Sequence, residues 1–443
     1  MTSTDIHRTV VHGIETDRTV IQRTIEAVWR IESPRLIGAL TRMVRDVGIA
    51  EDLAQDALVA ALQQWPESGV PDNPAAWLMA AAKHRAIDHF RRATRLERKH
   101  EELGREFAEK ELAVPDFDSA LDDNVGDDLL RLLFISCHPV LSTDAQVALT
   151  LRLLGGLTTD EIARAFLVPE ATVAQRIVRS KRTLTAKHVP FELPRGEELA
   201  ARLSSVLSVI YLIFNEGYSA TTGEDWMRPA LCEEALRLGR ILAELAPSEP
   251  EIHGLVGLME IQASRSKARV GPGGEPVLLF DQNRAHWDQL LIRRGLAALD
   301  RSETLRSGKA GRERGWYELQ GAIAACHAQA RTPEQTDWAR IVQLYGMLAE
   351  VAPSPVVELN RAVAVSMASG PDAGLKLVDA LRNEPSLESY HLLPSVRGDL
   401  LKKLRRFEEA RAEFERAASL TQNTRERALL QGRARECAGL ASA

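Results

Sequence analysis

The sequence predicts an all-α fold with two small helical domains followed by a helical-repeat domain. Ala, Leu, Arg and Glu, which are strong helix formers, fill most segments of the 443 residues. The alternation of Val, Ile and Thr that is typical of half-buried strands is nearly absent, and apolar residues recur at helical spacing instead. The length is sufficient for two or three domains with cores of their own.

Composition excludes several classes of protein. Charged residues make up 27% and hydrophobic residues 45%, as in an ordinary soluble protein. Apolar runs are all shorter than the roughly 20 residues of a membrane span, and the first residues lack the apolar segment of a signal peptide. We therefore expect a cytoplasmic protein that does not contact a membrane. The cysteines lie far apart, which predicts free thiols and no metal site; they are Cys137, Cys232, Cys326 and Cys437.

Residues 1–100 are expected to form the first domain. Helices are predicted near 24–46 and 50–64, with Asp46 and Gly48 between them. The segment 65–74 contains three prolines, so it cannot be helical throughout. Pro74 is suited to the first turn of the next helix.

The helix that begins at Pro74 is apolar at first and strongly basic later, although the chain has a net charge of −6. Trp77, Leu78, Ala81 and Ile87 are expected to face the core, with a pocket for a nucleic-acid base as the alternative for Trp77. Taken alone, the basic face has a plain alternative as a solvated surface. Its positively charged residues and histidines are Lys83, His84, Arg85, His89, Arg91, Arg92 and Arg95.

Residues 101–127 are acidic and are expected to form a solvated linker. The alternative is a negatively charged segment that mimics nucleic acid in a binding groove. The linker separates the first domain from a second small helical domain, which is predicted over residues 128–190.

A helix-turn-helix is predicted within the second domain, over residues 156–184. Thr158 or Thr159 is suited to cap its first helix, and Val173, Ile177 and Leu184 are expected to face inward from its second. Gln and Arg can contact base edges in the major groove, and further basic residues suit phosphates. The alternative is a bundle hairpin with a solvated basic face. The outward residues are Glu170, Thr172, Gln175, Arg176, Arg179, Lys181 and Arg182.

Residues 197–443 form the third part, and an internal repeat favours stacked helix pairs. "LAELAPSEPE" at 242–251 reappears as "LAEVAPSPVVE" at 348–358. Gly398, Ala410, Phe414 and Ala417 lie where tetratricopeptide repeats place small and aromatic packing residues. Two aromatic-polar clusters suggest either a packed interdomain contact or a regulatory pocket: Phe214, Asn215, Glu216 and Tyr218, and Asp281, Gln282, Arg284 and Trp287.

"ESPRLIGALTRMVRDVGIAEDLAQDALVAALQQWP" followed by "PAAWLMAAAKHRAIDHFRR" resembles region 2 of an extracytoplasmic-function (ECF) sigma factor. The helix-turn-helix resembles region 4, and the remainder resembles the subgroup with a large C-terminal tetratricopeptide-like domain. The resemblance implies a bacterial initiation factor whose partners are core RNA polymerase and promoter DNA. It assigns polymerase binding to Glu51, Asp52, Gln55 and Asp56.

The resemblance also assigns the DNA contacts. Residues 128–190 would bind the −35 element as duplex through the outward residues of the second helix. Region 2 would bind the −10 element as opened strand, and the loop 65–74 would supply a base pocket, with Asn73 and Asp72 as candidates. The residues expected to act there are Asn73, Lys83, His84, Arg85, Asp88, His89, Arg91, Arg92 and Arg95.

No enzymatic activity and no cofactor are expected. "NEGYSAT" lacks the spacing of a nucleophile elbow, and "VGPGGEPV" lacks the context and the lysine of a phosphate loop. The C-terminal domain is expected to support or regulate activity, and a protein regulator is a candidate partner. The alternative function is a helix-turn-helix transcriptional regulator whose tetratricopeptide-like domain senses a partner.

Overall fold

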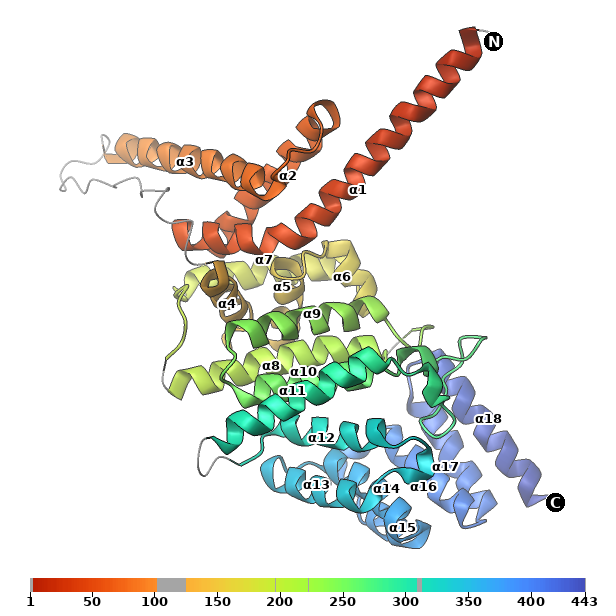
Figure 1. Cartoon of the computed structure of the whole chain (residues 1–443). Helices are drawn as coiled ribbons and strands as arrows, with labels where there is room; N and C mark the ends of the chain where they lie inside the picture. The colour runs from red at the N-terminus through yellow and green to blue at the C-terminus, as the bar shows by residue number, and fades with distance from the viewer. Residues whose placement is uncertain (1–2, 102–124, 196, 222, 309–312, 443) are drawn as a thin grey trace. The chain divides into compact units, whose positions relative to one another are not determined.

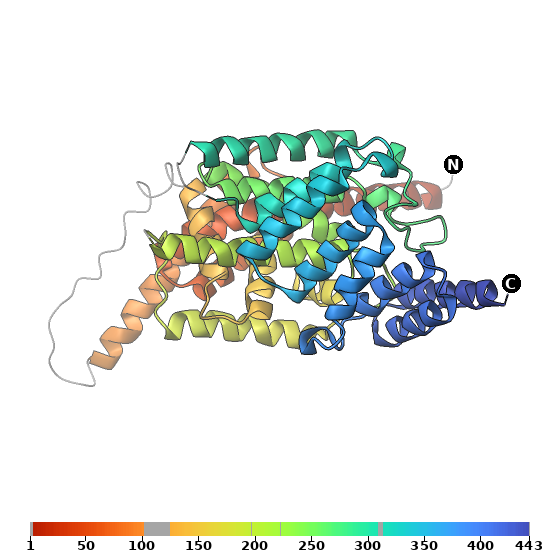
Figure 2. The same ribbon diagram turned by 90° about the horizontal axis from the view of Figure 1, so that it is seen from below.

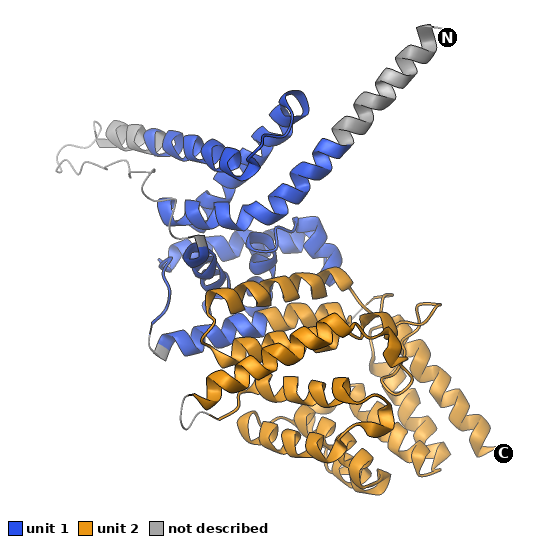
Figure 3. Ribbon diagram, in the orientation of Figure 1, with its two compact units in different colours: residues 1–209 blue, residues 210–443 orange. Residues whose placement is uncertain are grey.

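The computed structural model describes residues 3–101, 125–195, 197–221, 223–308 and 313–442. Side chains are described from residue 20 to 91 and, beyond Val125 and except for Glu197, throughout the later ranges. The chain divides into two compact units, residues 1–209 and 210–443 (Figure 3). The described residues form helices joined by loops, with two isolated β-bridges, which confirms the all-α class. The expected acidic linker lies outside the described residues from 102 to 124.

Unit 1 begins with three helices, α1 (Ser3–Val44), α2 (Val47–Ser68) and α3 (Pro74–Glu101) (Figure 1). Asp46 caps α2, because its Oδ1 accepts a hydrogen bond from the Ile49 amide at 2.9 Å. α2 continues through Pro66, beyond the expected end at residue 64. Trp65, only 1% exposed, packs the last turn into the core, and the Gly69 amide closes the helix on the Trp65 carbonyl at 2.9 Å.

α3 begins at Pro74 as predicted, but its buried stripe differs in part from the expected one. Leu78, Ala82 and Ala86 are buried, at the i, i+4 and i+8 spacing of one helix face. Ala81 and Ile87 are half-buried because they lie beside that stripe, so their expected core positions were wrong. Trp77 is also half-buried, and its ring meets that of Trp65 edge-on at 5.3 Å.

The helix-turn-helix is formed by α6 (Thr159–Phe166) and α7 (Glu170–Ala186). Both helices pack on α5 (Thr143–Leu153), which in turn packs on α4 (Val125–Ser136). Thr158 caps α6: the Glu161 amide donates to its Oγ1 at 3.1 Å, and Glu161 Oε2 accepts from the Thr158 amide at 2.8 Å. Leu167 makes the turn with a left-handed φ of 51°. The predicted inward residues of α7, which are Val173, Ile177 and Leu184, are buried.

α8 (Glu197–Tyr218) contains the boundary between the units. Its first half belongs to unit 1, where Arg202 Nη2 donates to the Phe134 carbonyl at 2.8 Å and Ser205 Oγ donates to the Cys137 carbonyl at 2.8 Å. Within the described residues, α8 is long and apolar enough to cross a membrane by length and composition, but a core helix can pass the same test. Several of its apolar residues are buried in the protein, among them Val206, Ile210 and Phe214.

Unit 2 is a series of helices in which each packs on its neighbour in sequence (Figures 1 and 2). Both copies of the internal repeat span the end of one helix and the start of the next, and each second helix begins with a proline. The helices are α9 (Pro229–Leu245), α10 (Pro250–Ala263), α11 (Gln289–Ser307), α12 (Trp316–Gln329), α13 (Trp338–Val351), α14 (Pro355–Ser369), α15 (Pro371–Ala380), α16 (Leu392–Lys403), α17 (Phe407–Leu420) and α18 (Thr424–Ala441). Short 3-10 turns, η1 (Ser266–Ala268), η2 (Arg284–His286), η3 (Pro333–Gln335) and η4 (Pro385–Leu387), lie in its loops.

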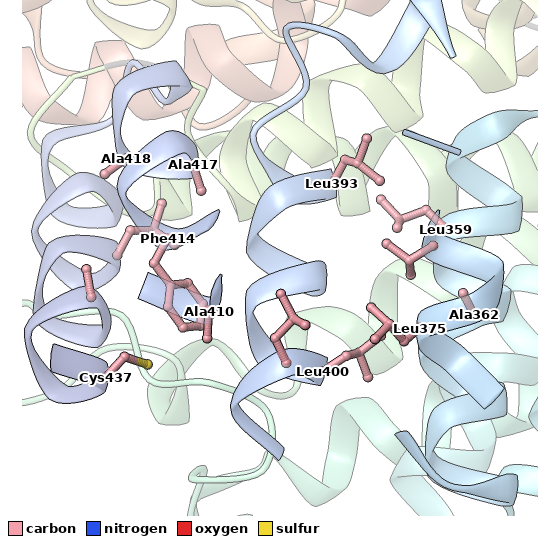
Figure 4. Packing of buried hydrophobic residues seen from close by; sticks show 14 of the residues in the cluster. Leu359, Ala362, Leu375, Leu393, Leu400, Ala410, Phe414, Ala417, Ala418 and Cys437 are labelled. Atoms are coloured by element: carbon pink, nitrogen blue, oxygen red, sulfur yellow. The ribbon is translucent and has the colours of Figure 1, made fainter. Parts of the chain in front are cut away.

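The small and aromatic residues predicted to pack helix pairs do so in the core of α16 to α18 (Figure 4). Ala410, Phe414 and Ala417 are fully buried. A Cβ atom on Gly398 would lie 2.9 Å from the Phe414 ring, so glycine is what allows α16 and α17 to approach this closely.

Replacing Phe414 by alanine should lower the free energy of unfolding of unit 2 by about 3–5 kcal/mol, because the lost ring leaves a cavity between the helices. Phe414→Leu keeps most of the volume and should cost under about 1.5 kcal/mol. Denaturant unfolding of the full chain, followed by the helical circular dichroism signal, measures both changes. Equal stability of the two variants would contradict this packing role.

Candidate nucleic-acid interface

The basic face of α3 lies opposite its buried stripe. His84, His89 and Arg91 are exposed, as is Asp88, and Lys83 and Arg85 are half-buried. Arg85 Nη1 lies 3.5 Å from Asp56 Oδ2 on α2; their side chains are 40% and 57% exposed, so solvent screens this ion pair and makes it weak. The side chains of Arg92 and Arg95 lie outside the described residues. The described part of α3 therefore presents a cationic surface with histidines along it.

Asn73 begins α3 at one end of this face. Its Oδ1 accepts a hydrogen bond from the Ala76 amide at 3.0 Å, and its carbonyl accepts one from Trp77 at 3.1 Å. The side chain is exposed, so the cap fixes an accessible amide beside the helix N-terminus. A base-pocket role for Asn73 stays a prediction.

The outward face of α7 matches the predicted recognition surface in most positions. Glu170, Gln175, Arg179 and Arg182 are exposed, and Thr172 is half-buried. Arg176 is also half-buried, with its Nη2 2.9 Å from Asp144 Oδ2 on α5.

Three residues of the same face were missed by the sequence analysis. Ala171, Ala174 and Val178 are exposed between the polar side chains, and Val178 is 44% exposed. Their spacing of three and four residues could have predicted that they share one face of α7. Small apolar groups on a recognition helix can contact the methyl group of thymine.

Glu51 and Lys181 were expected to be exposed to solvent, but they are paired with each other and Glu51 is buried. Glu51 on α2 is 3% exposed; its Oε1 accepts from Arg152 Nε at 2.6 Å and its Oε2 lies 2.5 Å from Lys181 Nζ on α7. Burial alone would raise the pKa of Glu51, but Lys181 and Arg152 together hold that pKa below its ordinary value. The residues predicted to bind polymerase and −35 DNA are thus bonded to each other within unit 1.

The remaining polar residues of α2 keep the expected exposure. Asp52 and Asp56 are exposed and Gln55 is half-buried, where its Nε2 donates to Glu51 Oε1 at 2.6 Å. Val59 and Leu62 continue this face with exposed fractions of 47% and 42%. The surface is therefore part acidic and part apolar, and only its acidic part was predicted from the sequence.

The two aromatic-polar clusters of unit 2 divide differently from the expected grouping. Phe214 is buried and stacks on Tyr218 with ring centroids 5.6 Å apart. Tyr218 and Trp287 flank the guanidinium of Arg265, which lies 5.7 Å and 5.8 Å from their ring centroids. Arg284 lies 4.8 Å from the Trp287 ring. The remaining predicted members have other surroundings: Asn215 is half-buried, Glu216 pairs with Arg228, Gln282 donates to the Val277 carbonyl at 3.1 Å, and Asp281 is exposed.

Among the residues that the structure describes, no group of three or more His, Cys, Asp or Glu side chains could hold a metal ion. The four cysteines are free thiols, and burial raises the pKa of Cys137 to about 12.

Three families match successive parts of the chain. Residues 29–96 match Sigma-70 region 2, residues 131–184 match Sigma-70 region 4, and residues 202–303 match a family of unknown function, DUF6596. The first range contains most of α3, and the second contains α6 and most of α7. The third contains Tyr218 and Trp287.

Similar proteins extend this result. An uncharacterised protein of Rhizobium meliloti is 44% identical over 90% of this chain and 92% of its own length. The probable ECF RNA polymerase sigma factor SigI of Mycobacterium tuberculosis is 25% identical over 37% of this chain and 56% of its own length. SigK of Mycobacterium sp. is 27% identical over 36% of this chain and 82% of its own length. No solved structure matches the chain at a significant level.

The relatives named as sigma factors each match a little over a third of the chain, and Sigma-70 regions 2 and 4 are matched within residues 29–184. The match to the Rhizobium meliloti protein spans 90% of this chain, so these regions and the C-terminal helices occur together in one protein. With Sigma-70 regions 2 and 4 both present in unit 1, the chain acts as a sigma factor in transcription initiation. It belongs to the extracytoplasmic-function sigma factors, in the subgroup that carries a large additional C-terminal helical domain.

Proposed function

We propose that this sigma factor binds core RNA polymerase through α2, holds opened promoter DNA through α3, and reads duplex DNA upstream through α7. The observation that carries the proposal is the exposed row on α7, in which Gln175, Arg179 and Arg182 project from the second helix of a helix-turn-helix. Such a helix enters the major groove with its exposed side against the base edges.

The polymerase contact uses the exposed face of α2. Asp52 and Asp56 complement a basic partner and steer association, and Val59 and Leu62 supply apolar area that charge alone lacks. The partner proposed for this face is core RNA polymerase.

The opening of the promoter uses α3. An unpaired strand exposes phosphates to Lys83, Arg85 and Arg91, and counterion release makes such binding salt-dependent. A base captured out of the stack near Asn73 recovers part of the unstacking energy, which is a few kcal/mol. These contacts assign the −10 element to region 2.

The ion pair between Glu51 and Lys181 joins α2 to α7, and we call this arrangement of the two helices closed. Lys181 cannot contact phosphate, and Glu51 cannot contact polymerase, while each is the other's partner. Use of either residue in the initiation complex requires α2 and α7 to separate. Gln175, Arg179 and Arg182 are exposed in the closed arrangement.

The C-terminal helices support or regulate this activity, and a protein regulator is the partner proposed for them. Stacked helix pairs present an extended surface that suits a protein or peptide. The chain has no enzymatic activity of its own in this proposal, because polymerase performs the chemistry. It works in the cytoplasm, where its polymerase and promoter partners are found.

The test is transcription by core polymerase and the full chain on a library of genomic promoter fragments. The double variant Gln175→Ala and Arg179→Ala should reduce promoter-specific transcripts about 30-fold or more, since each of the two DNA contacts is worth roughly 1–3 kcal/mol. Arg195→Ala removes an exposed charge outside α7 and should leave transcription unchanged.

Absence of promoter-specific transcripts with the unaltered chain would overturn the proposal. If the chain instead bound a closed duplex tightly without polymerase, the alternative of a helix-turn-helix regulator with a partner-sensing domain would replace it.

A further inference from the structure

Three arginines of unit 2 lie among aromatic rings and lack the acidic partners that arginines have elsewhere in this chain. We call Tyr218, Trp226, Arg265, Arg269, Arg284 and Trp287 the arginine–aromatic cluster. Arg269 lies 3.7 Å above the Tyr218 ring and 5.5 Å from Trp226, and Arg284 lies 4.8 Å from Trp287. Arg265 lies between the rings of Tyr218 and Trp287.

The cluster carries three positive charges, and none of its arginines forms an ion pair with a carboxylate among the described residues. Other partly buried arginines of unit 2 do so: Arg397 pairs with Asp379 and Glu413, each at 2.8 Å. Arg269 and Arg284 are instead held by backbone carbonyls, at 3.0 Å from Tyr218 O and 2.7 Å from His327 O. These bonds orient the guanidiniums without cancelling their charge.

The cluster also collects unpaired buried polar atoms. The Nε atoms of all three arginines, the indole nitrogens of Trp226 and Trp287, and the Tyr218 hydroxyl are buried with no hydrogen-bond partner. Trp287 is only 3% exposed and Tyr218 only 8%. Each buried polar group costs about 1–3 kcal/mol when it has no hydrogen-bond partner. Several such groups in one place therefore destabilise the folded protein unless a ligand binds there.

The positive charges of the cluster lower the pKa of neighbouring basic groups. Burial lowers the pKa of Arg269, although the nearby phenol group of Tyr218 opposes this shift, and Arg265 lowers that pKa further. Burial lowers the pKa of His327 to about 4, with Arg265 and Arg284 as the next causes, so this imidazole is neutral at pH 7 and adds no charge.

The site is partly open to solvent. Arg265, Arg269 and Arg284 are all half-buried, and the guanidinium of Arg265 makes no hydrogen bond to any described residue. Its donors are therefore available at the surface of the cluster. Guanidinium groups bind phosphoryl oxygens in pairs of hydrogen bonds, and indole and phenol groups add single donors.

We propose that the arginine–aromatic cluster is a binding site for a small, multiply charged phosphoryl anion, with Arg265 as its principal contact. An anion with two or three negative charges would balance the three guanidiniums and would supply acceptors for the unpaired donors. A single carboxylate supplies too little charge. The proposal does not depend on the roles of α2, α3 and α7, because every residue of the cluster lies in unit 2.

The experiment titrates the full chain with sodium pyrophosphate and with inorganic phosphate by calorimetry, and with chloride at matched ionic strength. Pyrophosphate should bind with about one-to-one stoichiometry and raise the melting temperature of the protein, whereas chloride should do neither. ADP in a further titration distinguishes a free phosphate from the phosphate of a nucleotide, because tighter binding of ADP than of pyrophosphate identifies a nucleotide.

Arg265→Gln should weaken pyrophosphate binding about tenfold or more, because a charge-assisted contact is lost. Arg294→Gln removes an exposed arginine from α11, outside the cluster, and should change affinity less than about twofold. Trp287→Phe keeps a ring in the core but removes the indole donor, and it should weaken binding severalfold without loss of folding. The proposal is overturned if pyrophosphate fails to bind, or if Arg294→Gln weakens binding as much as Arg265→Gln.

Discussion

Replacing Lys83, Arg85 and Arg91 together by glutamine should abolish promoter opening by the holoenzyme while leaving its assembly with core polymerase intact. All three side chains lie off the buried stripe of α3, so the helix keeps its packing on α1 and α2. A hydrogen bond to a charged group is worth about 1.5–3 kcal/mol, and three lost phosphate contacts should lower open-complex formation by roughly 1,000-fold or more.

Permanganate reactivity of unpaired thymines measures the opening directly, and co-elution with core polymerase measures assembly. The logarithmic salt dependence of open-complex formation should also decrease by about two, since each single-strand phosphate contact contributes roughly 0.7. The matched control replaces Arg23, Arg35 and Arg45, which are exposed on α1 and just after it, by glutamine and removes the same charge. If both triple variants open the promoter equally well, α3 is not the surface that holds the strand.

The local structure of this chain was predictable where it depends on nearby residues. Pro74 begins α3, and Thr158 and Glu161 form a reciprocal cap, because each of these effects acts within one helical turn. Phe414 and Gly398 were identified from their spacing, since a glycine opposite an aromatic ring is a recurring solution to close helix packing.

Errors arose where tertiary packing selects among equivalent local patterns. Helical periodicity placed Glu51 on a polar face correctly, but it could not show that Arg152, 101 residues away, would cover that face. Ala81 and Ala82 are equally small, and only the position of the neighbouring helices made Ala82 the buried one. Arg265 was not predicted as a member of the cluster because it follows α10, between the two segments that contain Tyr218 and Trp287.

Replacing Glu51 by glutamine should lower the free energy of unfolding of unit 1 by about 3–5 kcal/mol at pH 7, because two cations then lose a buried partner. Asp52→Asn is the matched control: Asp52 is 78% exposed and lies 3.7 Å from the same Lys181, so its loss should cost under about 1 kcal/mol. Hydrogen exchange of α2 and α7 amides in the full chain localises the change, and denaturant unfolding gives its size.

The pH dependence of stability tests whether the charge of Glu51 causes this stabilisation. The pKa of Glu51 is lower in the folded protein than in the unfolded chain, where a glutamate has a pKa of about 4.3. The stabilisation is therefore complete above that unfolded value and is lost as pH falls through the lower, folded value. The stability difference between the wild type and Glu51→Gln should shrink over that acidic range and stay constant from pH 6 to 8. Faster exchange in both helices would also show that this ion pair holds α2 and α7 together, as the closed arrangement requires. If Glu51→Gln and Asp52→Asn unfold alike at pH 7, the ion pair does not hold unit 1 closed.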